Sequence, residues 1–276
     1  MSKLDEQGRK AAERFRKAHG LGTNPLGDLV TLVEQTTEAD VAIVEAGPDE
    51  HGLTMRHDRN GSIFIAVAST ANAMRQRSTL AHELAHVLFE DWSETEEYTA
   101  RPPSEVRADS FARHLLIPGE GIKKFVQSHG WNSTEAELSK IVQWFLVSPA
   151  IAAIALEHHG YIDDATKERW MRVSTRQLAT RYGWMDQYKS LQSESQRSRA
   201  PQRLLARAVT GYEEGLISAQ QIANIRGISE AEVLKEFDEI GLTPQVDDVD
   251  WLSAEDLPEV QVDLSDLDDA PDWDEE

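Results

Sequence analysis

The spacing of apolar residues changes twice along the chain. Residues 3–18 have the amphipathic spacing of a helix. The segment NPLGDLVTLVEQ predicts a second helix, with Asn24 as its N-cap and Pro25 at its first helical position. Strand-like segments follow at 40–46, 52–57 and 62–69. The last two are separated by Asp58 to Gly61, whose Asn60-Gly61 pair is a strong hairpin signal. We therefore expect a small antiparallel sheet.

Helical spacing returns after the strands and continues to about residue 241. The predicted helices cover 78–91, 104–118, 122–130, 136–145, 149–160, 166–183, 201–215, 218–227 and 230–241. The fold class is therefore α+β, a small sheet packed with helices and followed by a mostly helical C-terminal region. We expect a first domain at 1–125, a helical region at 126–243 with a helix-turn-helix-like pair near 215–240, and a tail at 244–276.

The charge of the chain is concentrated in this tail. Its 33 residues hold fourteen of the acidic side chains and no Lys or Arg. Removing those fourteen from the formal charge of -21 leaves -7 for residues 1–243. Acid interspersed with apolar residues is typical of disorder, so the tail is predicted to be disordered. The acidity argues against broad binding to nucleic acid, which depends on many Lys and Arg contacts to phosphate.

Composition narrows the possible chemistry. The chain has no cysteine, so a metal must be held by histidine and carboxylate. No apolar run approaches 18 residues and the N-terminal segment is mixed in charge, so we expect neither a membrane span nor a signal peptide. The expected compartment is the cytoplasm.

In the segment STLAHELAHVLFED, the run from Leu80 to Phe89 is apolar except for three ionisable residues, His82, Glu83 and His86. His82 and His86 are four residues apart, which places both imidazoles on one helical face. A zinc ion fits there, with room for a third protein ligand and a water. Glu83 is offset by one residue and can accept a proton from that water as general base. By itself the pattern H-E-x-x-H is moderately specific, because a structural helix can contain it by chance.

The next predicted helix offers the missing ligand. Glu105 and Asp109 share one face of it, so Glu105 could complete the zinc site while Asp109 accepts the second ring N–H of a ligand histidine. The longer metzincin pattern is absent, because Phe89 and Trp92 stand where that pattern has glycine and histidine.

Two segments, MRQRSTLAHELAHVLFE and SEVRADSFARHLLIP, together resemble the ImmA/IrrE family of zinc metallopeptidases. The resemblance covers about residues 10 to 120. It implies His82, His86 and Glu105 as ligands of one Zn²⁺ per chain, Glu83 as catalytic base and Asp109 as the partner of a ligand histidine. The chain departs from the family pattern at Ser78, at Ala85 and at Ala66 or Ala68, none of which is a predicted ligand.

Members of this family are known for cleaving or inactivating helix-turn-helix repressors of mobile-element or stress genes, so the resemblance implies such a repressor as substrate. We expect the substrate to add as an extended strand along the edge of 62–69. Tyr98, Arg101 and His114 are candidates for a second group that stabilises the oxyanion. His114 lies nine residues after Glu105, about half a turn out of phase with it.

Two alternatives to a peptidase remain open. The chain could be a regulatory binding protein with a non-catalytic zinc site, although Glu83 favours catalysis because a structural site needs no base. It could also be a DNA-binding regulator through 215–237, although the acidic residues of the second helix there have the wrong sign for the major groove. The basic segment 172–207 has the opposite charge to the tail, so we expect the tail to mask it or to bind a basic partner.

Overall fold

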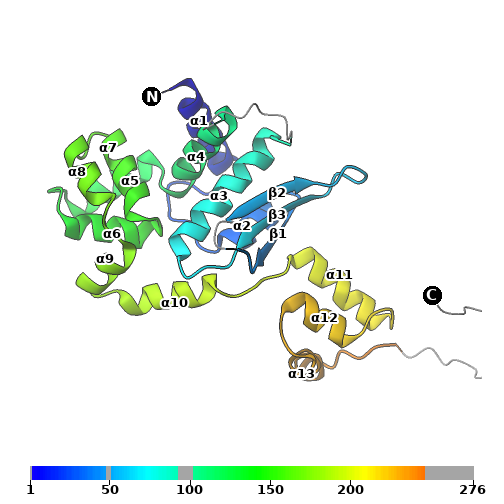
Figure 1. Cartoon of the computed structure of the whole chain (residues 1–276). Coiled ribbons are helices and arrows are strands. Elements are labelled where there is room, and N and C mark those ends of the chain that lie inside the picture. The colour runs from blue at the N-terminus through cyan, green and yellow to red at the C-terminus, as the bar shows by residue number, and fades with distance from the viewer. Residues whose placement is uncertain (1, 48–50, 93–101, 246–276) are drawn as a thin grey trace, which may run out of the picture.

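The computed structural model describes residues 2–47, 51–92 and 102–245. Within these ranges the chain is an α+β protein, as predicted, with one small sheet and a majority of helices (Figure 1). The predicted disordered tail, Tyr98 and Arg101 lie outside the described residues.

The sheet has three strands in the order β1-β3-β2. They span Ala39–Val44 (β1), Gly52–Arg56 (β2) and Ile63–Ala68 (β3). The predicted hairpin is confirmed, because β2 and β3 pair antiparallel. The sheet as a whole is not antiparallel, however, since β1 pairs parallel to β3. The expectation that 62–69 offers a free edge is also wrong, because β3 lies between its two neighbours.

One outer strand of the sheet is partly covered by a distant segment of the chain. Ile43 of β1 exchanges backbone hydrogen bonds of 2.8 and 2.9 Å with Arg199. Within the described residues, β2 has no strand partner on its outer side. Because an unpaired strand exposes N–H and C=O groups, β2 is the edge on which another strand could add.

Four helices pack on this sheet or on one another beside it. They are α1 (Lys3–Ala18), α2 (Leu29–Thr36), α3 (Ala73–Phe89) and α4 (Pro103–Leu116). Helix α2 begins four residues later than Pro25 predicts, because Asp28 is its N-cap and accepts the Thr31 N–H at 3.1 Å. Helix α3 packs against β2 and β3, and α4 packs between α3 and α1. Gly8 permits the close approach of α1 to α4, since a Cβ there would lie 2.5 Å from the Arg107 carbonyl oxygen.

The later helices form two groups in Figure 1. The first group contains α5 (Gly119–His129), α6 (Glu135–Phe145), α7 (Pro149–His158), α8 (Asp164–Trp170), α9 (Thr175–Arg181) and α10 (Met185–Ser195). The second contains α11 (Gln202–Glu213), α12 (Ala219–Arg226) and α13 (Glu230–Ile240). The stretch predicted as one helix at 166–183 is two helices, because Ser174 begins α9 with a capping box. Helix α10 was not predicted.

The buried apolar side chains form two clusters. The larger cluster contains residues from Ala11 to Tyr188, so it extends across the predicted domain boundary at residue 125. The smaller cluster lies within α11 to α13. The helix-turn-helix-like pair is therefore α12 and α13, which share this small core with α11. The domain boundaries themselves stay a prediction.

No single helix in the described ranges is long and apolar enough to cross a membrane. Helices α6 and α7 meet the length and composition criteria only as a pair bent by 107°. Both contribute buried side chains to the larger core.

Candidate metal centre

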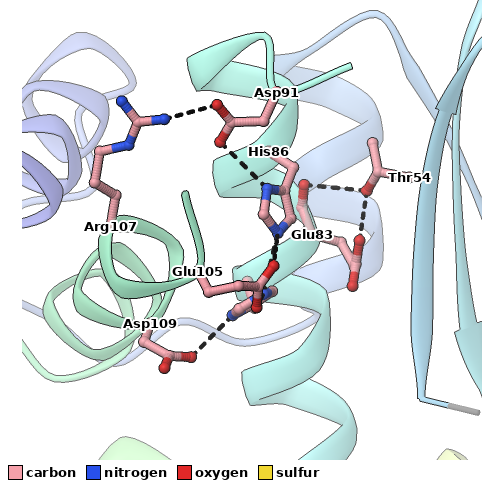
Figure 2. A network of polar contacts seen from close by, with 8 residues as sticks. Thr54, Glu83, His86, Asp91, Glu105, Arg107 and Asp109 are labelled. Carbon is pink, nitrogen blue, oxygen red and sulfur yellow. Dashed lines mark hydrogen bonds and ion pairs between the residues drawn. The ribbon is translucent and has the colours of Figure 1, made fainter. Parts of the chain in front are cut away.

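His82 and His86 lie one turn apart on α3 and direct the same ring atom to the same point. Figure 2 shows the His86 ring with the Glu105 carboxylate beside it. The Nε2 atoms of the two histidines are 3.1 Å apart. Glu105, in the first turn of α4, completes this cluster, with Oε2 at 3.2 Å from Nε2 of His82 and Oε1 at 3.4 Å from Nε2 of His86. The structure thus brings together the three residues that the sequence predicts as ligands.

The outer nitrogen of each ring faces a carboxylate. Nδ1 of His82 lies 3.0 Å from Oδ1 of Asp109, as predicted, and Nδ1 of His86 lies 3.3 Å from Oδ2 of Asp91. An ionised carboxylate can only accept a hydrogen bond, so each Nδ1 carries the proton and donates it. In a neutral ring the Nε2 then has a free lone pair, and both lone pairs face Glu105. A shared cation would relieve the repulsion among these three electron-rich groups.

The spacing suits a tetrahedral ion. Four ligands at about 2.1 Å from zinc lie roughly 3.4 Å from one another, because that is the edge of such a tetrahedron. The three distances in the cluster, from 3.1 to 3.4 Å, are close to this value. The residues present therefore fit an ion such as zinc, and they leave a fourth position for water or substrate.

Asp91 was not predicted, and the end of α3 explains its position. The C-cap, Glu90, has left-handed backbone angles with φ 55°, which reverses the chain directly after the helix. The Asp91 N–H then donates to the His86 carbonyl at 3.0 Å, and its side chain returns to the His86 ring. Arg107 of α4 holds the other oxygen of Asp91 at 2.7 Å, and so links the ends of the two helices.

Glu83 lies beside this cluster and is 8% exposed. Thr54 of β2 donates its hydroxyl to Oε2 of Glu83 at 2.7 Å. The first residue of β2 is a glycine for a steric reason, since a Cβ at Gly52 would lie 2.6 Å from Oε1 of Glu83. Sequence patterns single out neither Thr54 nor Gly52, because strand β2 meets Glu83 only in the folded chain.

The charges of the cluster raise the pKa of His82. Burial by itself would lower the pKa of His82, but the hydrogen bond to Asp109 and the negative charges of Glu105, Asp109 and Glu83 together raise that pKa above its usual value. The cluster therefore attracts positive charge, which is the property required of a cation site.

The remaining candidate, His114, lies in a different place. It is buried on α4 against His158 and Asp5. The structure therefore does not place it with the predicted ligands, in agreement with its helical phase relative to Glu105.

An α+β fold with two histidines and a glutamate around one point, and a second, buried glutamate beside them, is typical of a metallopeptidase. The comparison with known families gives the same class. Residues 36–157 match the family Peptidase_M78, described as the IrrE N-terminal-like domain. The predicted ImmA/IrrE resemblance is thereby confirmed. A search of curated proteins found no match.

Proposed function

We propose that the chain is a zinc-dependent endopeptidase that hydrolyses a peptide bond in a specific cytoplasmic protein. The observation that carries the proposal is the convergence of His82, His86 and Glu105 within 3.4 Å, with Glu83 held separately by Thr54. A purely structural metal site does not need a buried carboxylate such as Glu83 beside its ligands. Protein ligands also tend to fill all the coordination positions of such a site.

The ligands are His82, His86 and Glu105, and Asp109 and Asp91 fix the orientation of the two rings. A bound zinc ion supplies a Lewis acid for the attacking water and for the scissile carbonyl. Glu83 removes a proton from the water as it attacks the carbonyl carbon. The C–N bond then breaks and Glu83 returns the proton to the leaving amine. Thr54 keeps the Glu83 carboxylate oriented for both transfers.

Strand β2 is the best place for a substrate to bind. Among the described residues it is the open edge of the sheet, and it carries Thr54, so a strand added to it would run beside Glu83. Leu53 and Met55 on either side of Thr54 are 54% and 51% exposed, and offer apolar contacts to substrate side chains. An extended segment of a partly unfolded or flexible protein is the form of substrate that such an edge accepts.

As the particular substrate we propose a helix-turn-helix repressor of a mobile element or a stress response, on the strength of the family resemblance. A substrate trap tests this. The Glu83→Gln chain retains the ligands and loses the base, so it should bind the substrate without cutting it.

The trap is expressed in the native host, cross-linked and purified beside the wild type. We expect one regulator to be recovered intact with Glu83→Gln and shortened, or absent, with the wild type. Recovery of the same intact partner with both chains would instead favour a binding protein whose metal site is not catalytic.

A further inference from the structure

A second cluster of metal-binding side chains lies outside the centre described above. Asp5 of α1, His114 of α4 and His158 of α7 each offer one ligand atom, and these atoms all lie within 4.8 Å of one another. The three residues come from helices far apart in sequence. Asp5 also lies outside the range that matches the peptidase family.

The strongest indication of a ligand comes from His114. Its side chain is buried, with 5% of the residue exposed, and its Nε2 has no hydrogen-bond partner among the described residues. A buried polar atom without a partner costs about 1–3 kcal/mol, so such atoms are rare unless something binds them.

Asp5 supplies a negative charge at the same place. Its carboxyl is held by Arg113, whose Nη2 donates to Oδ1 at 2.5 Å. A carboxylate has about four lone-pair positions, so the bond to Arg113 leaves room for a further ligand. The guanidinium charge makes the site weaker than the one at His82.

The imidazoles are crowded against one another. The ring centroids of His114 and His158 are 5.7 Å apart, and those of His158 and His159 are 5.2 Å apart. Two protonated rings at such distances would repel each other, whereas neutral rings can share a cation. His159 is not one of the three clustered ligand groups, which makes it a natural control.

We propose that Asp5, His114 and His158 form a second metal site for a divalent transition ion such as Zn²⁺. Two imidazole nitrogens and one carboxylate oxygen suit zinc and its neighbours, whereas Mg²⁺ and Ca²⁺ prefer oxygen alone. Ligand atoms at zinc lie about 3.4 Å apart, so ligand atoms that are now up to 4.8 Å apart would approach one another by at most about 1.4 Å on binding. The ion would tie α1 and α7 to α4, the helix that also carries Glu105.

Zinc stoichiometry tests this proposal. The full chain is stripped with a chelator, reloaded with Zn²⁺ and passed through a weak competing chelator, which removes ions from exposed carboxylates. Metal content is then measured by mass spectrometry. We expect two ions per chain in the wild type and in His159→Gln, one in His158→Gln, and one in the double variant His82→Gln/His86→Gln. One ion in the wild type with none in the double variant, or an unchanged content in His158→Gln, would overturn the proposal.

Thermal stability gives a second readout that requires no activity. In the His82→Gln/His86→Gln background, Zn²⁺ at about 100 times its dissociation constant should raise the melting temperature by roughly 5 °C. Adding His158→Gln should abolish this rise, and adding His159→Gln should preserve it. Both histidines lie at the end of α7 and His158 is only partly buried, so each variant should fold. Equal rises in the two triple variants would contradict the site.

Discussion

The carboxylate of Asp91 lies 3.3 Å from Nδ1 of His86, in the same relation that Asp109 has to His82 at 3.0 Å. The two pairs come from different parts of the fold, since Asp109 is on α4 and Asp91 directly follows the C-cap of α3. Each carboxylate fixes one ring so that its Nε2 faces Glu105. The centre thus depends on five side chains rather than on the three that face the ion.

Removing either carboxylate should weaken metal binding. We expect Asp91→Asn and Asp109→Asn each to reduce zinc affinity about 10–100-fold, because an amide holds the ring less firmly in the ligating orientation and lowers the basicity of the ligand nitrogen. Competition with a chromophoric chelator measures the affinity. Asp58→Asn, in the exposed turn between β2 and β3, is the control. Equal affinities for all four chains would refute the orienting role.

Gly52 should matter for catalysis and not for metal binding. In Gly52→Ala the new Cβ would lie 2.6 Å from Oε1 and 2.9 Å from Cγ of Glu83, so the base must move. A displacement of about 1 Å in a reacting group costs on the order of 100-fold in rate. We expect a fall of that size in the cleavage rate of the trapped substrate, with unchanged zinc content. Gly27→Ala is the matched control, since nothing lies within 4 Å of a Cβ there. If both variants cut like the wild type, Glu83 is not held as described.

Asp28 should make the fold sensitive to acid. Burial favours its neutral form, but hydrogen bonds from Thr31 and Arg199 hold the pKa of Asp28 below its ordinary value. The Asp28 carboxyl therefore binds a proton more readily in the unfolded chain than in the folded chain. The stabilisation is present above the unfolded pKa of about 3.9 and is lost as the pH falls through the folded value.

Asp28→Asn keeps an N-cap side chain and removes this titration. Because the Asp28 side chain is 45% exposed, the difference should be below about 1 kcal/mol. Urea unfolding of both chains at pH 7 and pH 3 measures it. The wild type should lose more unfolding free energy than Asp28→Asn between the two pH values. An identical loss in both chains would show that Asp28 does not cause the acid sensitivity.

The sequence alone predicts the features that depend on the spacing of residues close together in the chain. His82 and His86, like Glu105 and Asp109, are four residues apart on one helix, so their shared faces follow from helical geometry. The β2–β3 hairpin follows in the same way from Asn60-Gly61. Helix α10 escaped prediction because its sequence is mostly polar, and contacts far along the chain hold it, such as the Gln192 side chain on the Ala71 carbonyl at 2.7 Å.

Other features depend on the folded chain. The parallel pairing of β1 with β3 is not encoded in either strand alone. Asp91 reaches His86 only because Glu90, a residue that rarely adopts left-handed angles, does so here. Arg199, Arg203 and Arg181 of the basic segment pair with acidic residues of the body, namely Asp28, Asp40 and Glu135. Part of that segment's charge is therefore already balanced, and masking by the acidic tail stays a prediction.

In the proposed mechanism, Glu83 acts as the base of a zinc peptidase. The most direct test is mass spectrometry of new protein N-termini in the native host, comparing wild type, Glu83→Gln and a deletion strain. Loss of a general base typically costs 10²–10⁴-fold, so termini made by this enzyme should be present in the wild type and absent from both other strains. We expect these termini to be concentrated in one regulator. If the wild type and Glu83→Gln yield the same termini while the deletion still changes transcription, the chain is a binding protein and Glu83 is not a catalytic base.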